Sequence, residues 1–467
     1  MTHDEDRLRW LIGVILLGGI MGILDGTMVA VAADTLTVEF GSSLSAVGWV
    51  STGYLLTLTV TIPVTGWAVG RFGAKRLWLA GLLLFLAGSL ASGMAWNVGS
   101  LIVFRVVQGL GAGILDPLVL VLLARAAGPA RAGRVMGTMA AVLSLGPVLG
   151  PVVGGLVLDG LGWRWMFLIN LPIGMAAFLL ALRLIPADEP ATRRTPLDVV
   201  GLALLGPGFA AAGLALSQTA EQARFTTWQT LTPLAVSLVL LAAYAPHALR
   251  SRSPLVDLRL FGSRGFAASV GVMALTGVAM YTVLFVLPLH FQQQGHGALT
   301  AGLLVAPLGL GAAAASPIAG RFSDRIGGRT LVRAGALAAT AGTLALIRVG
   351  PDDPVRWPAL AGLVIGLGLG CVGAPTMGAL YRTLPAPLVP QGSSVLYMLN
   401  QLGASAGIAV VALIIETVGP STGFHRVAVF GAAVTAVILL AAALLPGRPA
   451  PEFTNPPAEA VTEGALR

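Results

Sequence analysis

The chain has 467 residues, of which 56% are hydrophobic and only 10% are charged. Soluble globular proteins carry about 25% charged residues, so this composition and a mean hydropathy of +0.87 exclude a soluble chain and indicate an integral membrane protein. Disordered, collagen-like and disulfide-stabilised chains are excluded on the same grounds. A membrane β-barrel is excluded as well, because the apolar runs exceed about eighteen residues and do not alternate.

Fourteen apolar runs follow one another along the chain, at 10–32, 45–69, 77–97, 99–124, 135–158, 164–184, 197–219, 230–249, 266–290, 299–319, 330–349, 357–381, 392–418 and 424–446. Most of them are long enough for a helix to cross roughly 30 Å of hydrocarbon. The sequence therefore predicts an all-α membrane protein with fourteen spans. The first run is too long, and its flank too acidic, for a cleaved signal peptide, so we expect it to be the first span.

The loops between these runs are short, so the positive-inside rule applies to them. With the N-terminus in the cytoplasm, most of the 28 basic residues lie in cytoplasmic loops. Arg105 lies within a run, and the residues predicted outside are Arg164, Arg224, Arg348, Arg356 and Arg426. This predicts a multi-pass protein of the cell inner membrane with both termini in the cytoplasm. The net charge of +8 is then spread beside anionic membrane lipid, which argues against a nucleic-acid partner.

The sequence has little that would hold a cofactor. Cys371 is the only cysteine, so neither an internal disulfide nor a cysteine metal cluster is expected. The histidines show no metal-ligand spacing, and Lys75, the only lysine, is not in the Gly-Lys-Ser/Thr context of an ATP-binding loop. The string from Gly368 to Gly373 lies inside an apolar run, so we interpret it as helix packing instead of a dinucleotide site. We expect no metal, no cofactor and no enzymatic activity.

One internal repeat is visible. The segment from Gly66 to Arg76 follows the second run, and the segment from Gly320 to Arg329 follows the tenth. Both combine a glycine turn with clustered positive charge. If the first six runs correspond to the last six, the seventh and eighth are an insertion, and two six-helix halves are typical of secondary transporters. The predicted domains are 1–184, an inserted pair with its linkers at 185–265, 266–446, and a cytoplasmic tail at 447–467.

Several short motifs occur in order on these runs. They are Leu24 to Ala32 in the first run, Gly66 to Arg76 after the second, Arg105 to Gly113 in the fourth, Gly146 to Gly155 in the fifth, and Pro254 to Phe261 before the ninth. Together they resemble the major facilitator superfamily, in its fourteen-span drug:proton antiporter branch. The resemblance covers essentially the whole chain.

The resemblance implies two six-helix bundles plus two inserted helices. It also implies that the chain exports drug-like amphipathic or cationic molecules in exchange for protons by alternating access, with membrane lipid as its other partner and a monomer as its state. An exporter of lipids, siderophores or metabolites, or an importer, stays open as an alternative on the same fold. A membrane-embedded sensor or enzyme is a remote alternative, because no catalytic constellation is present.

The resemblance assigns gating to the two glycine turns. The residues concerned are Gly70, Arg71, Lys75 and Arg76 in the first copy, and Asp324, Arg325 and Arg329 in the second. The family usually has an aspartate at the position of Gly70, where it stabilises the outward-facing state by pairing with positive charge. Because only the second copy keeps this acid, as Asp324, we expect gating to depend on that copy.

Acids inside membrane spans are costly and usually functional. Asp25 and Arg105 lie about 10 Å and about 9 Å inside the outer ends of their spans, so we predict a charge pair. A nearby guanidinium lowers the proton affinity of a carboxylate while desolvation raises it, so moving Arg105 on and off Asp25 would couple transport to protons. The alternative is a static buried ion pair.

Four further acids lie within the predicted spans or at their edges. Asp116 lies on the same helix face as Arg105, near the predicted cytoplasmic mouth. It is either a second proton or cation site, or a polar residue that contacts water in the inner vestibule. Glu416 lies near the outer end of its span, where it is either a proton-coupling residue or an acid at the membrane interface. Asp34 is expected at the interface, and Asp198 at a helix N-terminus, where the helix dipole stabilises it.

The fifth run carries the antiporter motif Gly146, Pro147, Gly150, Pro151, Gly154 and Gly155. Glycines at steps of four allow close backbone approach, and proline bends a helix. We predict a bent helix at the interface of the two halves, with ordinary helix packing as the alternative. The residues expected to line a substrate cavity, or else to pack between helices, are Met28, Tyr54, Gln108, Tyr281, Phe285, Asn400 and Gln401.

Overall fold

The computed structural model describes residues 2–128, 131–188, 196–222, 224–350, 353–385 and 388–446, and this part of the chain contains helices and no strand. The helices of the first half are α1 (Thr2–Met28), η1 (Val29–Ala32), α2 (Ala33–Phe40), α3 (Leu44–Phe72), α4 (Ala74–Gly93), α5 (Val98–Ala127), α6 (Ala132–Leu161), α7 (Trp165–Leu168) and α8 (Asn170–Leu184). Those that follow are α9 (Val199–Gln222), α10 (Trp228–Arg250), η3 (Leu258–Gly262), α11 (Arg264–Gln293), α12 (Ala298–Ile326), α13 (Gly328–Ile347), α14 (Arg356–Thr383), α15 (Val389–Val418), α16 (Pro420–Ala441) and η5 (Ala442–Leu444).

The helices agree with the predicted spans to within a few residues. Thirteen helical segments among the described residues are long and apolar enough to cross a membrane, the fifth of them running from Trp165 to Leu184 through α7 and α8. The remaining span is α6, a continuous helix of 30 residues whose two apolar parts are Ala132–Gly146 and Val152–Leu161. The prediction of fourteen spans is confirmed, and the chain is a multi-pass membrane protein.

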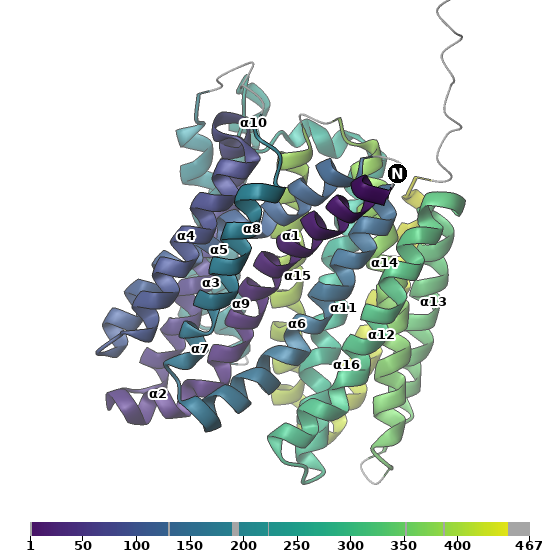
Figure 1. The fold of residues 1–467 in the computed structure, drawn as a ribbon. Coiled ribbons are helices and arrows are strands. Elements are labelled where there is room, and N and C mark those ends of the chain that lie inside the picture. The colour runs from purple at the N-terminus through teal and green to yellow at the C-terminus, as the bar shows by residue number, and fades with distance from the viewer. Residues whose placement is uncertain are drawn as a thin grey trace, which may run out of the picture.

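The spans form two bundles and an inserted pair, as predicted. The first bundle comprises α1 to α8 and the second comprises α11 to α16, while α9 and α10 pack against each other and α9 also contacts α3 and α15. The bundles meet where α6 contacts α12 and α14, and where α15 contacts α3 and α5. In Figure 1 the long helices stand side by side, and α2 and α7 lie at the end opposite the N-terminus.

One end of the molecule is rich in arginine, and we call it the basic end. There α3, α5, α12 and α14 end, and α4, α6, α13 and α15 begin. Its described basic residues include Lys75, Arg76, Arg125, Arg134 and Arg382, whereas the residues predicted on the other side all lie at the opposite end. The predicted separation of charge between the two ends is therefore present in the fold.

Side chains at helix starts explain several element boundaries. Asn97 and Ser100 form a reciprocal capping box at the start of α5, with Ser100 N donating to Asn97 Oδ1 over 2.7 Å. Asp198 accepts from Gly201 N over 2.8 Å at the start of α9, as its predicted place at a helix N-terminus requires. Asp198 also pairs with His247 at 2.7 Å, which joins the two inserted helices at the basic end.

α6 lies at the interface of the two halves, as predicted, because it contacts α12 and α14, whereas its glycine stripe faces α1 inside the first bundle. A Cβ atom at Gly154 would lie 3.2 Å from Met28 Cα, and side-chain atoms at Gly146 and Gly150 would collide with Ile23 and Thr27 of α1. These small residues let α1 and α6 approach closely, whereas nothing lies within 4 Å of a Cβ at Gly155. The predicted bend rests on Pro147 and Pro151, whose side chains lie outside the described part of the structure.

Candidate functional site

The predicted pair of Asp25 and Arg105 is present and completely enclosed. Asp25 on α1 is 1% exposed, and its Oδ2 accepts a hydrogen bond from Nη1 of Arg105 on α5, which is 0% exposed. The second carboxylate oxygen accepts from Gln108 Nε2 and from Asn170 Nδ2, each over 3.0 Å. The enclosed carboxylate is thus held by one guanidinium and two amides.

The guanidinium of Arg105 is held on several sides. Its Nε donates to Val50 O over 3.3 Å, Nη1 also donates to Gln108 Oε1 over 2.8 Å, and the ring of Tyr54 lies 4.1 Å from its central carbon. Among the described residues Nη2 has no hydrogen-bond partner although it is buried. An unsatisfied buried donor is costly, so this guanidinium has a hydrogen bond to gain if it moves.

Two residues of this network were not predicted. Ser89 accepts from Gln108 over 3.2 Å and from Asn170 over 3.0 Å, and donates to Phe167 O over 2.9 Å. Asn170 begins α8 inside an apolar run, so its amide was a visible signal of a buried polar partner.

Gln108 was predicted to line the substrate cavity. It is 0% exposed and faces Asp25 instead, because its amide bonds the charge pair.

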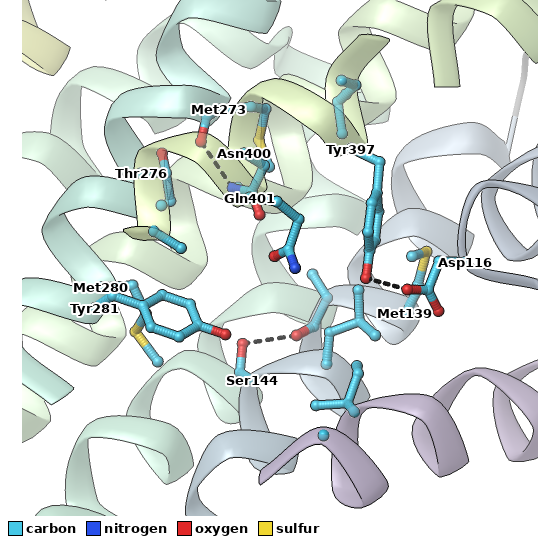
Figure 2. A pocket seen from close by; sticks show the side chains of 18 of the residues that line it. Asp116, Met139, Ser144, Met273, Thr276, Met280, Tyr281, Tyr397, Asn400 and Gln401 are labelled. Atoms are coloured by element: carbon cyan, nitrogen blue, oxygen red, sulfur yellow. Dashed lines mark hydrogen bonds between the residues drawn. The ribbon is translucent and has the colours of Figure 1, made fainter. Parts of the chain in front are cut away.

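A cavity of about 370 Å³ lies between the bundles. Its lining comes from α1, α3, α5 and α6 of the first bundle, and from α11, α12, α14 and α15 of the second. Figure 2 shows Asp116, Met139 and Tyr397 on one side of this cavity and Met280 and Tyr281 on the other. The surface is mostly apolar with a few polar groups, which is the usual character of a small-molecule site.

Four of the residues predicted to line a substrate cavity do so: Tyr54, Tyr281, Asn400 and Gln401. Asn400 donates to Met273 O over 2.8 Å, which fixes its amide at the cavity wall. Met28 and Phe285 are not among the lining residues. Met28 is 2% exposed and packs against the glycine stripe of α6, which fits the alternative of packing between helices, and Phe285 is 38% exposed on α11.

Asp116, which was predicted near the cytoplasmic mouth, lines the cavity between the bundles. Its side chain is 7% exposed, and its Oδ2 accepts a hydrogen bond of 2.6 Å from the hydroxyl of Tyr397. The donor belongs to α15 of the second bundle, so the tyrosine covers the acid and links the bundles (Figure 2). Sequence reasoning missed Tyr397, since no motif marks it.

Glu416 is exposed near the end of α15 and does not line the cavity, which fits the alternative of an interfacial acid. The side chain of Asp34 lies outside the described part of the structure.

The first glycine turn binds residues of its own bundle. Lys75 Nζ donates to Leu182 O and Ile185 O, each over 2.7 Å. Asp188 accepts from Lys75 N over 2.9 Å and from Arg76 N over 3.0 Å, and so caps α4. Gly70 and Arg71 are exposed, and a Cβ at Gly70 would meet nothing within 4 Å.

The second turn joins the two bundles. Asp324, near the end of α12, accepts from Gly133 N over 2.9 Å and from Arg134 N over 3.0 Å at the start of α6. It also pairs with Arg382 Nη1 at 2.8 Å. A carboxylate at a helix N-terminus satisfies free N–H groups and interacts favourably with the helix dipole. Asp324 is thus a charged contact between α6, α12 and α14.

The remaining residues of the second turn lie apart from that contact. Arg329 donates from Nε and Nη2 to Leu445 O over 2.9 and 2.6 Å, within its own bundle, and Arg325 is exposed. Arg382 of α14, which no motif marks, is the residue that pairs with the acid.

Within the described ranges, groups of three or more metal-ligating side chains do not occur. His290, His296 and His425 line a second pocket at the opposite end of the second bundle without forming such a group. Two glycines of the string at 368–373 pack against neighbouring helices, with Gly368 facing α13 and Gly370 facing α12, whereas Gly373 lines the cavity. This packing agrees with the structural interpretation of that string.

Known proteins are similar to this chain in sequence and in fold. The profile of the Major Facilitator Superfamily matches residues 15–408. The Multidrug resistance protein B homolog of Mycobacterium tuberculosis is 38% identical over 409 residues, covering 86% of this chain and 75% of that protein. The Multidrug export protein EmrB of Haemophilus influenzae is 33% identical over 396 residues, covering 84% and 78%. The crystal structure of the human organic anion transporter MFSD10 superposes with a TM-score of 0.66 at 18% identity, covering 93% and 99%.

Proposed function

The chain belongs to the Major Facilitator Superfamily, and from this premise we propose that it is a proton-driven exporter of drug-like small molecules. The observation that carries the proposal is the likeness to proteins named for multidrug resistance and multidrug export, at 38% and 33% identity over more than four fifths of the chain. The apolar cavity between the bundles supplies a site of the expected kind.

In this proposal the cavity faces each side of the membrane in turn as the bundles rock against each other. The rocking units are the predicted domains 1–184 and 266–446, with the inserted segment 185–265 attached to both. The basic end lies in the cytoplasm together with both termini, as the positive-inside rule favours, the membrane is the inner membrane, and the working unit is a monomer.

Proton coupling is assigned to Asp25 and Arg105. A proton on Asp25 would remove the charge that holds Arg105, and the guanidinium could then shift towards a partner for its unsatisfied Nη2. Neither residue lines the cavity, but Tyr54 does, and its ring lies 4.1 Å from the guanidinium carbon. Tyr54 therefore gives a substrate in the cavity a direct mechanical contact with the proton-binding pair.

The contact of Asp324 with the start of α6 supports its assignment as the gate at the basic end. Closing that end would form charge-assisted hydrogen bonds across the bundles, and opening it would break them. The first copy has Gly70 in the corresponding position. Its residues Lys75 and Arg76 would stabilise their own bundle and would not act as a gate.

The test is transport into inverted membrane vesicles energised by an imposed pH gradient. The expected result is drug accumulation that an uncoupler abolishes, together with increased drug resistance of an efflux-deficient host. Transport that the uncoupler does not change would overturn proton coupling. An absence of transport for every drug in a broad panel, with the protein present in the membrane, would overturn drug export.

Variants of the charge pair test the coupling step. Asp25→Asn should abolish proton-driven turnover while drug binding persists, because binding uses the cavity and coupling uses the enclosed pair. Arg105→Ala should also stop turnover, and Arg105→Lys should rescue it poorly, since an ammonium does not replace a planar guanidinium. Full activity of Asp25→Asn across the pH range would defeat the assignment.

A further inference from the structure

The motif from Pro254 to Phe261 lies where the inserted pair joins the second bundle, and no step of the proposed transport cycle uses it. Its first part, residues 254–256, connects α10 to η3 and α11 at the basic end, and we call it the strap. Leu255 and Val256 are buried, although connections between helices normally run over the surface. A buried backbone needs partners for its N–H and C=O groups, and these partners show what holds the strap.

Two side chains of the inserted helices bind the backbone of the strap. Tyr244 of α10 donates its hydroxyl hydrogen to Val256 O over 2.7 Å and accepts from Val256 N over 2.8 Å. Asp198 accepts from Leu255 N over 3.1 Å, and its other oxygen pairs with His247 at 2.7 Å. The strap is therefore fixed to the start of α9 and to the last turns of α10.

The strap lies beside the crossing of α3 and α15, where the two bundles meet. Nε2 of Gln391, at the start of α15, is 3.5 Å from Pro254 O, and the Cα atom of Gln391 is 3.4 Å from the Cβ position of Gly66 on α3. Leu255 and Val256 belong to one apolar cluster with residues of α3 and α15, and α9 contacts both of these helices. Parting α3 from α15 at the basic end would expose these side chains to water or break the bonds of the strap.

The strap and the Asp324 contact lie at different crossings of the basic end. Where α6 crosses α12, Asp324 supplies a charged contact between the bundles. Where α3 crosses α15, the corresponding residue is Gly70, and nothing lies within 4 Å of its Cβ position. The inserted pair thus contacts the crossing at which the glycine turn has no acid.

We propose that the inserted pair is a second gate at the basic end, in which Asp198 and Tyr244 are positioning residues that hold the strap against the crossing of α3 and α15. This inference rests on the proposed alternating access and gives the inserted helices a role in it. The held strap favours closure, because opening costs the burial of apolar side chains and leaves backbone groups of the strap without partners. Neither Asp198 nor Tyr244 lines the central cavity, so this gate is separate from drug binding.

The experiment measures distances between cysteine labels in the purified full-length protein, in a Cys371→Ala background because Cys371 is the only cysteine. One label pair lies on the basic ends of α3 and α15, and the other lies on those of α6 and α12. Tyr244→Phe removes the hydroxyl that binds Val256. It should raise the population in which α3 and α15 are separated by about threefold or more, with a smaller change between α6 and α12.

Asp198→Ser is the second variant. Serine still caps α9, but its shorter side chain does not reach Leu255 N or His247, so the same shift is expected. Thr219→Val is the matched control, because it removes a buried hydroxyl at the other end of α9 that bonds Ala215 O of its own helix. It should leave both distances unchanged.

The two gates should act independently. Tyr244→Phe combined with Asp324→Asn should open the basic end further than Asp324→Asn alone, since the effects of separate contacts add. A merely structural role of the strap predicts a lower melting temperature in Tyr244→Phe and Asp198→Ser with unchanged distances. That result, an equal shift in Thr219→Val, or a double variant no more open than Asp324→Asn overturns the inference.

Transport into vesicles separates the inference from the proposed function. If wild type exports drugs and the strap variants leave the distance between α3 and α15 unchanged, drug export stands and the second gate is overturned. If the strap variants shift this distance in a protein that transports none of the drugs, the second gate is supported and drug export is overturned.

Discussion

The two glycine turns at the basic end have the same backbone conformation but contact different parts of the molecule. Gly73 and Gly327 have φ values of +90° and +88°, and each is followed by a helix whose early basic residue bonds carbonyls at the end of a bundle. Lys75 bonds Leu182 and Ile185, and Arg329 bonds Leu445. The repeat therefore keeps the contacts that lie inside each bundle.

The contacts between bundles are not repeated. Asp324 caps α6 of the other bundle, whereas the start of α15 faces the first turn at Gly66, whose Cβ position lies 3.4 Å from Gln391 Cα. The position corresponding to Asp324 is Gly70, and Pro390 at the start of α15 has no N–H to donate. The second turn therefore joins the bundles through charged hydrogen bonds, whereas the first turn meets the other bundle by packing at Gly66.

The largest effect is expected from Asp324→Asn. The amide cannot accept from two N–H groups and neutralise Arg382 as the carboxylate does, and hydrogen bonds to a charged group contribute about 1.5–3 kcal/mol. The balance between the two states should shift tenfold or more towards opening at the basic end. Distances between labels on the basic ends of α6 and α12 measure this shift.

Asp188→Asn is the control for that experiment, because Asp188 caps α4 with the same geometry but inside one bundle. It should lower thermal stability and leave the distance between bundles unchanged. An equal change of distance in both variants would show that the two turns are equivalent after all.

Alanine at the turn glycines should have the next largest effect. A residue with a Cβ atom is strained in this backbone region by about 1–3 kcal/mol, so Gly73→Ala and Gly327→Ala should each lower the melting temperature of the purified protein. Gly73→Ala should lower it more, because its Cβ would collide with the side chain of Asp188. A smaller loss at Gly73 than at Gly327 would contradict the role of that contact.

Removing the basic side chains should have smaller and similar effects in the two bundles. Lys75→Gln and Arg329→Gln each remove charge-assisted bonds at a partly exposed helix end, with an expected cost of about 1 kcal/mol. Thermal unfolding of both variants measures the cost. If either variant changed the distance between bundles, its contact would not be confined to one bundle.

The smallest effect is expected from Gly70→Asp. The new carboxylate would find the N–H of Gln391 but none on Pro390, so it should favour closure by less than Asp324 does. Adding Pro390→Ala supplies the missing donor and should increase the gain. The same label distances report both variants, and a gain from Gly70→Asp alone as large as the loss from Asp324→Asn would refute this explanation of the asymmetry.

Much of the molecule follows from the sequence alone. Apolar runs and the placement of arginines determine the number of spans and the two ends, because hydrocarbon excludes polar groups wherever a helix crosses it. Depth along a helix follows from its rise per residue, which is why the pairing of Asp25 with Arg105 was predictable. The two glycine turns were also predictable, since positive φ is a local requirement that glycine meets.

Only the tertiary structure decided which way the side chains face. Gln108 joins Asp25 instead of the cavity, the glycine stripe of α6 meets α1, and Met28 packs against that stripe instead of lining the cavity. The bond of Asp116 to Tyr397 joins positions 281 residues apart. Each of these depends on how a helix is rotated about its axis against its neighbours, and that rotation is set by the packing of both bundles together, which no single span encodes.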